Sequence, residues 1–224
     1  MNLILNIDTA VDVASVCLAG DGKVLQYDSN KTLKDHASWL HPAISKLLMD
    51  SGFSMPDLKA VAVSIGPGSY TGLRIGLSSA KGICYALNIP LIAIGTLDMM
   101  AFAVKDEGGN LICPMIDARR MEVFTALYDK DLKQLTEPSA MVIDENSFSE
   151  HLSAKKIIFH GNGSNKLRPI ITNSNAVFSP IQANAVHLAE LSSPGFIKQE
   201  FADLAYIQPL YVKEFFMHPR KALP

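Results

Sequence analysis

One short segment, Ser64–Gly76, limits the fold more than any other part of the chain. Its sequence is S-I-G-P-G-S-Y-T-G-L-R-I-G, and it follows an apolar run at 60–65 that predicts a buried strand. The Gly-Pro-Gly-Ser stretch predicts a tight turn, and the residues after it predict a helix over 70–88. Backbone N–H groups at the start of such a helix can hold an anion, or Ser69 or Thr71 can cap them. The spacing matches neither a Walker A loop nor a GxGxxG loop, so both interpretations stay open.

The helix expected over 70–88 carries more apolar surface than contact with one sheet requires. A second stripe, rich in Gly, Ser and Ala, lies on a different face and consists of Gly72, Ile75, Gly76, Ser79, Ile83 and Ala86. Each glycine inside a helix costs roughly 1 kcal/mol relative to alanine, so packing must outweigh helix propensity here. Either the helix expected over 36–50 covers this stripe or a partner protein does, and the sequence favours neither.

The order of the expected elements predicts a mixed sheet with helices packed on it. The first half contains strands at 3–7, 13–19, 23–27, 60–65 and 91–94, and helices at 36–50, 70–88 and 96–104. Asp35 is the expected N-cap residue of the first helix. The polar, glycine-rich stretch 105–110 is the best domain boundary. Beyond it we expect strands at 111–116, 123–128, 141–143 and 156–159, and a helix at 183–191.

Three groups of polar residues are candidates for contact with a phosphate or a metal ion. Asp8 ends the first expected strand and Asp12 follows it, as in many Mg²⁺ sites, but the loop between them has no glycine to wrap a phosphate. A structural role for Asp8 is at least as well supported. Arg119 and Arg120 lie beside acidic residues at a turn, which predicts either a salt-bridged hairpin or an anion or partner contact. The glycine turn at 160–164 is a weak indication of nucleotide contact.

Charge and cysteine content exclude several classes of function. The 20 Lys and Arg against 22 Asp and Glu give a net charge of −2, which disfavours a protein that wraps nucleic acid by itself. The three cysteines include no CxxC pair, so neither a disulfide framework nor a zinc knuckle is expected. His36 and His41 are five residues apart, on different faces of a helix, which disfavours a metal pair. Without a signal peptide or an unbroken apolar span, a soluble cytoplasmic protein is expected.

Four segments of the chain resemble one known family. The segment Ser64–Gly76 closely resembles the hallmark of the TsaB family, also called YeaZ, although Tyr70 stands where the family often has Phe. The stretches 4–10 (I-L-N-I-D-T-A), 116–124 (I-D-A-R-R-M-E-V-F) and 209–212 (P-L-Y-V) resemble further family segments in the same order. The resemblance covers essentially the whole chain.

This resemblance implies an α/β fold of two lobes, the actin- and hexokinase-like (ASKHA, RNase H-like) fold with mixed sheets flanked by helices. It implies an N-terminal lobe over 1–106, completed by the C-terminal segment 196–224, and a C-terminal lobe over 107–195. It also implies a non-catalytic scaffold or dimerisation subunit in the formation of N6-threonylcarbamoyladenosine (t6A) at position 37 of tRNAs that read ANN codons. In this family a homologous TsaD subunit carries out the transfer, together with the ATPase TsaE.

The same resemblance implies how such a subunit works. It needs no cofactor or metal of its own, since ATP is used by the complex, and it reaches tRNA only through the complex. TsaD binding, and a homodimer, use the two helices of the N-terminal lobe. The partner-binding residues implied here are Trp39, Leu40, Ile44, Leu47, Tyr70, Thr71, Gly72, Arg74, Ile75, Gly76, Ser79 and Ile83. The residues expected at an anion or nucleotide contact are Asp8, Gly68, Ser69, Arg119 and Arg120. The alternative function is an independent ASKHA-type ATP-dependent transferase or kinase.

Overall fold

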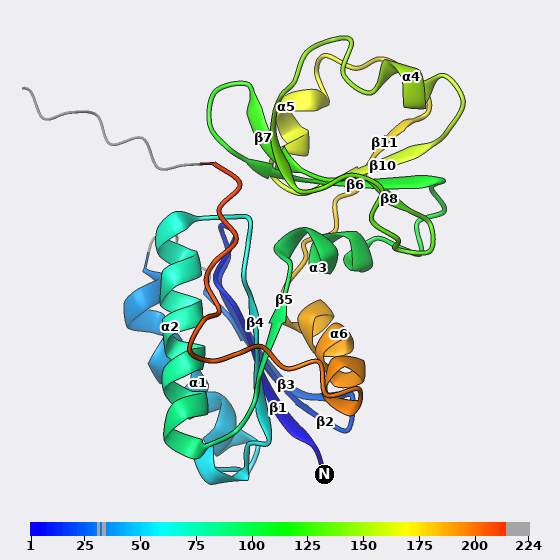
Figure 1. Cartoon of the computed structure of the whole chain (residues 1–224). Helices are drawn as coiled ribbons and strands as arrows, with labels where there is room; N and C mark the ends of the chain where they lie inside the picture. The colour runs from blue at the N-terminus through cyan, green and yellow to red at the C-terminus, as the bar shows by residue number, and fades with distance from the viewer. Residues whose placement is uncertain (31, 33–34, 214–224) are drawn as a thin grey trace, which may run out of the picture.

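The computed structural model describes residues 1–30, 32 and 35–213, which form two sheets with helices against their faces (Figure 1). The first sheet has the order β3-β2-β1-β4-β5. Strand β2 runs antiparallel to β1 and β3, whereas β4 and β5 run parallel to β1. The strands are β1 (Leu3–Asp8), β2 (Ser15–Gly20), β3 (Lys23–Ser29), β4 (Ala60–Ser64) and β5 (Leu91–Ile94).

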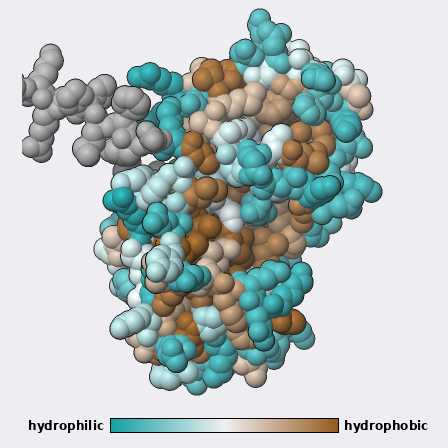
Figure 2. Space-filling view, viewed as in Figure 1, coloured by the Kyte–Doolittle hydropathy of each residue, from teal (hydrophilic) through white to brown (hydrophobic). Residues whose placement is uncertain are grey.

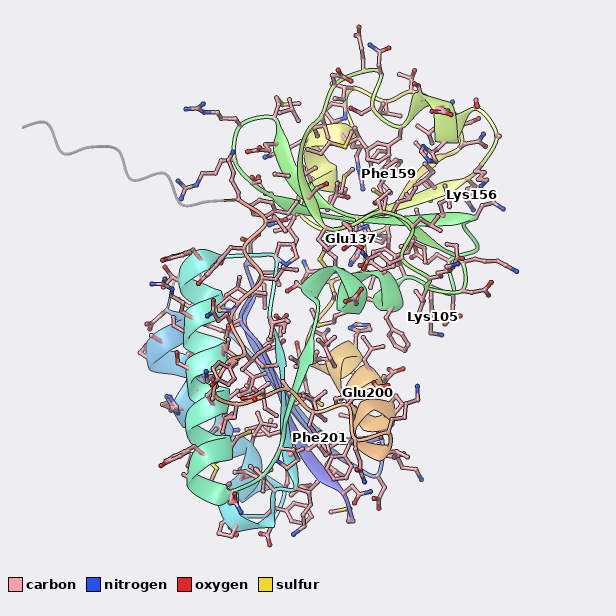
Figure 3. The ribbon with its side chains drawn as sticks, in the orientation of Figure 1. Lys105, Glu137, Lys156, Phe159, Glu200 and Phe201 are labelled. Carbon is pink, nitrogen blue, oxygen red and sulfur yellow. The ribbon has the colours of Figure 1, made fainter. Side chains whose placement is uncertain are left out.

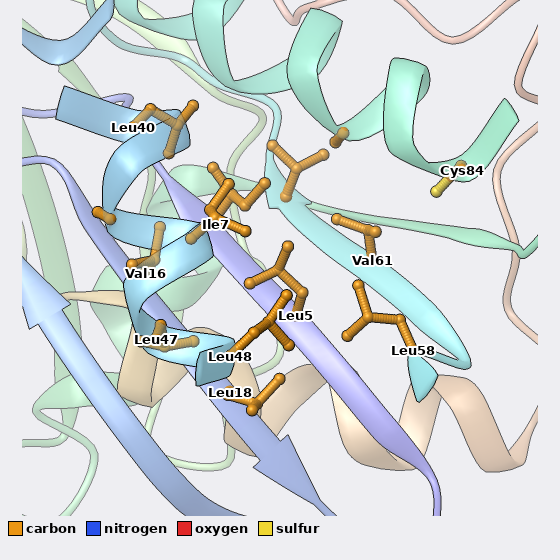
Figure 4. Close-up of a cluster of buried hydrophobic side chains, with 14 of the residues drawn as sticks. Leu5, Ile7, Val16, Leu18, Leu40, Leu47, Leu48, Leu58, Val61 and Cys84 are labelled. Atoms are coloured by element: carbon orange, nitrogen blue, oxygen red, sulfur yellow. The ribbon is translucent and has the colours of Figure 1, made fainter. Parts of the chain in front are cut away.

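Strand β1 is apolar along almost its whole length because helices cover both faces of this sheet. Helices α1 (His36–Asp50) and α2 (Tyr70–Leu87) cover one face, with the short helix η1 (Met55–Asp57) between them in the sequence. Leu5 and Ile7 point toward α1 and α2 and belong to their core, which Figure 4 shows from the side of these helices. Ile4 points the other way and packs in a separate cluster with Phe196 of α6 (Ala185–Ile197).

The second sheet has the order β11-β10-β6-β7-β9, and β8 also pairs with β6. Phe159 of β10 lies in the middle of this lobe, in contact with the rings of Phe148 and Phe178 (Figure 3). One core of the sheet includes Leu152 of α4 and Leu167 of α5. The strands are β6 (Leu111–Asp117), β7 (Glu122–Thr125), β8 (Tyr128–Asp129), β9 (Ser139–Val142), β10 (Ile157–His160) and β11 (Ala176–Phe178), and the helices are α4 (Ser149–Leu152) and α5 (Ser164–Leu167).

Two segments link the lobes. Helix α3 (Thr96–Ala103) shares a core with the second sheet, and the Tyr128 hydroxyl donates a hydrogen bond of 2.7 Å to Asp98 of this helix. Residues 203–213, which we call the C-terminal strap, cross the first lobe in front of α2 (Figure 1). The strap ends at Lys213, whose ammonium lies 2.6 Å from Glu122 of β7. An exposed pair of this kind contributes little stability, about 1 kcal/mol or less.

Helix α6 packs on the first sheet, although most of it falls within the range 107–195 expected for the C-terminal lobe. The Ser192 hydroxyl of α6 donates a hydrogen bond of 2.6 Å to the Asn6 side chain of β1. We therefore propose that the chain returns to the first lobe at the start of α6. Residues 214–224 of the expected C-terminal segment lie outside the described residues. Among the residues that the structure describes, no helix is both long and apolar enough to span a membrane.

Most elements lie where the sequence predicts them, and the two-lobed arrangement of mixed sheets flanked by helices is the expected fold class. The helix over 36–50 and the strand over 91–94 have the predicted bounds. The single strand expected over 123–128 was wrong, because the chain leaves the sheet at 126–127: β7 pairs with residues 115–117 of β6 and with β9, whereas β8 pairs with residues 111–112 of β6. Asp35 is the N-cap residue of α1, but its side chain makes no cap hydrogen bond.

Candidate functional site

A residue of the chain itself caps the start of α2. The Ser69 hydroxyl accepts a hydrogen bond of 3.2 Å from the Gly72 N–H, so Ser69 is the capping residue and Thr71 is not. The Ser69 N–H donates to the Ala10 carbonyl at 2.7 Å, and the Leu73 N–H donates to the Ser69 carbonyl at 2.8 Å. The structural interpretation of the turn is therefore the better supported one. Of the expected anion contact at Gly68 and Ser69, the Ser69 N–H is already engaged by the Ala10 carbonyl.

The loop after β1 fills the glycine-lined side of α2. A Cβ atom on Gly68 would collide with the Ala10 carbonyl, and one on Gly72 would collide with the Thr9 carbonyl. A Cβ atom on Gly76 would collide with the Thr9 hydroxyl. Neither α1 nor a partner protein covers these glycines, so both interpretations of this part of the stripe are wrong. The sequence lacks a signal for this contact because the loop is far from α2 along the chain.

Five of the residues implied to bind a partner are interior residues. Leu40 and Ile44 are 0% exposed and Leu47 is 2% exposed, since all three belong to the core between α1 and the first sheet. Gly72 and Gly76 are buried against the loop after β1. A partner that docks on the intact fold cannot contact these side chains, which corrects that part of the prediction. The other implied residues remain within reach: Trp39, Tyr70, Ile75, Ser79 and Ile83 are half-buried, and Thr71 and Arg74 are exposed.

An apolar groove lies between the two helices at the C-terminal half of α2. We call it the α1–α2 groove; it has a volume of about 510 Å³. It is lined by His41, Met55, Ser78, Ser79, Gly82, Ile83, Ala86 and Leu87. Apart from the neighbouring backbone of α2 itself, no atom lies within 4 Å of a Cβ built on Gly82, so this glycine opens onto free space, unlike Gly72 and Gly76. The Ser79 hydroxyl lies 3.2 Å from His41 Nε2, which joins the two helices at the edge of the groove.

The C-terminal strap runs along the same helix, where it contacts the N-terminal half through Tyr211 and accepts a hydrogen bond of 3.3 Å from Lys81 Nζ at the Ile207 carbonyl. The Tyr70 and Tyr211 rings lie 5.2 Å apart between centroids, and the Arg74 guanidinium lies 4.0 Å from the Tyr70 ring centre. Arg74 Nε donates a hydrogen bond of 3.1 Å to the Tyr211 hydroxyl. Sequence reasoning placed Tyr70 and Arg74 on the partner face but missed Tyr211. The strap leaves the α1–α2 groove as the apolar, accessible part of this face.

Asp8 is sealed inside the first lobe. One carboxylate oxygen accepts hydrogen bonds from the Ser64 hydroxyl at 2.6 Å and the Ala10 N–H at 3.1 Å. The other oxygen is buried and has no hydrogen-bond partner in the part of the chain that the structure describes. Burial raises the pKa of the Asp8 carboxyl, and the hydrogen bonds only partly offset this effect.

The two arginines were expected either in a salt-bridged hairpin or at an anion or partner contact. Arg119 and Arg120 are exposed at the turn between β6 and β7, with φ angles of 72° and 50°. The structure therefore does not bring their side chains and the buried Asp8 carboxylate together at one surface. At this turn it is Lys166, rather than either arginine, that pairs with Asp117, at 2.7 Å. The described residues include no cluster of three or more His, Cys, Asp or Glu side chains able to hold a metal ion.

Apolar side chains gather across the middle of one face, where the two lobes meet, while the periphery is mainly hydrophilic (Figure 2).

The comparisons with known proteins agree with this two-lobed architecture. Two solved structures from Pseudomonas aeruginosa are similar in fold: one described as YeaZ (TM-score 0.79, 24% identical, 94% of this chain and all of that chain) and one described as similar to peptidase YeaZ (TM-score 0.83, 23% identical, 95% of this chain and all of that chain).

Sequence comparisons identify the family. The family model described as TsaD, tRNA N6-adenosine threonylcarbamoyltransferase, matches residues 30–215. The tRNA threonylcarbamoyladenosine biosynthesis protein TsaB of Bacillus subtilis is 31% identical over 218 residues, which span 94% of this chain and 93% of that protein. TsaB of Escherichia coli is 38% identical over 129 residues, which span 57% of this chain and 55% of that protein. The match to the Bacillus protein covers nearly all of both sequences, and the chain therefore belongs to the TsaB (YeaZ) family.

Proposed function

We propose that this protein is a non-catalytic scaffold subunit required for the formation of t6A at position 37 of tRNAs that read ANN codons. In this proposal it pairs with a TsaD-type catalytic subunit through the α1–α2 groove, acts together with a TsaE-type ATPase, and meets tRNA only through the complex. The names of its relatives, which refer to threonylcarbamoyladenosine biosynthesis, support the pathway. The groove supports the mode of action.

The α1–α2 groove is the observation that carries the proposal. Its lining is largely apolar and includes Gly82, which faces free space. The neighbouring Tyr85 is 83% exposed. A specific interface typically buries about 800 Å² on each partner, which the faces of two helices can supply. The same face would serve a homodimer in the absence of the catalytic subunit. A homodimer and the complex would then compete for one surface.

The state of Asp8 favours the scaffold over an independent ATP-dependent transferase or kinase. Such an enzyme would need a carboxylate facing Mg²⁺ and phosphate. Asp8, the acid expected in that role, is 0% exposed and bonded to Ser64, and the adjacent helix start is capped by Ser69. The buried Asp8 carboxyl is therefore not in a position to face Mg²⁺ and phosphate.

The test is reconstitution with purified components from one source organism. Threonylcarbamoyl-adenylate, tRNA, a TsaD-type protein and a TsaE-type protein are incubated with and without this chain, and t6A is measured by nucleoside mass spectrometry. We expect no t6A from this chain alone and formation by the partner set only when the chain is added. Formation by the chain alone, or equal formation by the partner set without it, would contradict the proposal.

A further inference from the structure

His41 is an ionisable side chain in the wall of the α1–α2 groove. It is exposed in the first half of α1, and its Nε2 atom lies 3.2 Å from the Ser79 hydroxyl of α2. Among the described residues that line the groove, it alone can change its charge between about pH 5 and pH 8, because the others are apolar or carry only a hydroxyl. An otherwise neutral surface therefore contains one group whose charge follows the pH.

The contact with Ser79 is compatible with both charge states of the His41 ring. A neutral Nε2 atom can accept a hydrogen bond from the hydroxyl, and a protonated one can donate a hydrogen bond to it. The contact therefore holds the ring at the groove without fixing its charge. In the free protein the ring is exposed, so water solvates its charged form.

The acids of the elements around His41 are engaged away from the groove. Asp28 of β3 and Asp50 of α1 both act on Lys46, which pairs with Asp50 at 2.8 Å. Asp57 of η1 accepts two hydrogen bonds within its own turn, at 2.8 and 2.7 Å. None of these three acids belongs to the groove lining, so the described lining supplies no carboxylate that would stabilise a protonated His41.

The other charged or titratable groups of the two helices also face elsewhere. Arg74 of α2 donates a hydrogen bond to Tyr211 of the C-terminal strap, and Lys81 donates one of 3.3 Å to a strap carbonyl. His36, at the start of α1, acts on the buried Asp8. A positive charge at the groove would therefore have neither a compensating acid nor a competing cation among the described lining residues.

Docking of a partner removes water from the His41 ring. A partner that fills the groove places the ring in a largely apolar interface, and burial of this kind disfavours the charged form of an imidazole. Docking and proton uptake then oppose each other. The affinity is complete at pH values above about 6.5, where a histidine in water is neutral, and it is lost as the pH falls below this value.

We propose that protonation of His41 controls docking in the α1–α2 groove, so that mild acidification releases the TsaD-type partner. This inference rests on the function proposed above and adds regulation to the same surface. A docked state that excludes the proton should have a dissociation constant about tenfold larger at pH 5.5 than at pH 7.5, because about ten in eleven free imidazoles are protonated at the lower pH.

The experiment measures the dissociation constant for a TsaD-type protein from the same organism by calorimetry at pH 7.5 and pH 5.5, with the full chain. We expect the constant of the native chain to increase about tenfold at the lower pH. His41→Gln keeps a polar side chain without an ionisable ring and should reduce this ratio about tenfold, whichever groups of the partner also titrate. His151→Gln, which changes an exposed histidine of α4, is the matched control and should keep the native ratio. Circular dichroism at both pH values checks that each chain is folded.

NMR of histidine rings in the labelled native chain gives a second measurement that needs no folded His41 variant. At pH 5.5 the His41 signals should report a charged ring in the free chain and a neutral ring after the partner is added. Equal pH ratios for the native chain and His41→Gln, or a ring that stays charged in the complex, would overturn the proposal. Failure of the native chain to bind the partner at pH 7.5 would instead refute the pairing function, and this inference with it.

Discussion

The Thr9 hydroxyl donates a hydrogen bond of 2.7 Å to the Gly72 carbonyl and so joins the end of β1 to the first turn of α2. Both residues are buried, and the glycines of α2 allow the backbone of the loop to lie directly against the helix. The glycine-rich side of α2 is therefore an internal contact of the first lobe. The partner face proposed here is displaced toward the C-terminal half of the helix.

Gly76→Leu should destabilise the fold. The new side chain would have to enter the space held by the Thr9 hydroxyl, and overpacking of this kind typically costs about 1–3 kcal/mol. Gly82→Ala is the matched control, because its Cβ meets no atom and alanine favours the helix by about 1 kcal/mol. Urea unfolding should show opposite signs for the two variants. Equal stability of both would contradict the assigned role of Thr9.

Ala86→Lys should weaken binding to the TsaD-type partner. Ala86 lines the α1–α2 groove, and a lysine there would place a charge in the apolar interface without harming α2, since cations are favourable near a helix C-terminus. We expect the dissociation constant measured by calorimetry to increase at least tenfold. Ala154→Lys, at an exposed position of the second lobe, is the control. Unchanged affinity of Ala86→Lys would exclude the groove as the docking surface.

Asp8→Asn should stabilise the protein at neutral pH. The raised pKa of Asp8 means that the folded protein holds this proton at pH values where the unfolded chain, with a pKa near 3.8, releases it. The stability of the native sequence therefore decreases as the pH rises above 3.8, and the variant lacks this contribution. Chemical denaturation from acid to neutral pH measures the difference. A variant less stable than the native protein at pH 7 would show that the ionised carboxylate is favoured.

His160 should make the protein sensitive to acid. In the unfolded chain this histidine takes up a proton near pH 6.5, whereas burial, with a smaller effect from His187, holds its folded pKa at about 4. Stability contributed by the neutral ring is complete above pH 6.5 and is lost as the pH falls toward 4, by about 3 kcal/mol. His160→Phe should flatten this part of the stability profile, and the exposed His151→Phe should not. Identical profiles for the native chain and His160→Phe would refute the assignment.

Tyr211→Ala should loosen the C-terminal strap. It removes the ring contact with Tyr70 and the hydrogen bond from Arg74, and an aromatic pair contributes about 0.5–1.5 kcal/mol. Tyr211→Phe separates the two effects, since it keeps the ring and removes only the hydroxyl. Tyr206→Ala, which changes a strap tyrosine that is 80% exposed, is the control. If the Tyr206 variant unfolds at the same urea concentration as the Tyr211 variant, the contact of Tyr211 with α2 does not contribute measurably to the stability of the fold.

Local patterns predicted the elements well and their long-range partners poorly. The helix over 36–50 and the strand over 91–94 follow from short periodic apolar runs, so their bounds could be predicted from neighbouring residues alone. The short strand β11 and the helix α5 were missed, because each has few residues and depends on contacts with β10 and β6. The helix expected over 183–191 is present but extends to Ile197.

The amino-acid sequence by itself determined the family and the order of strands and helices, because these depend on motifs and on hydrophobic periodicity within short stretches. Only the tertiary structure decided which residues remain at the surface. Gly76 and Gly82 look alike within α2, yet one lies against Thr9 and the other opens onto the groove. Whether a residue is buried depends on which residues, distant in the sequence, pack against it in the folded chain. The spacing of residues along a helix does not show which distant residues these are.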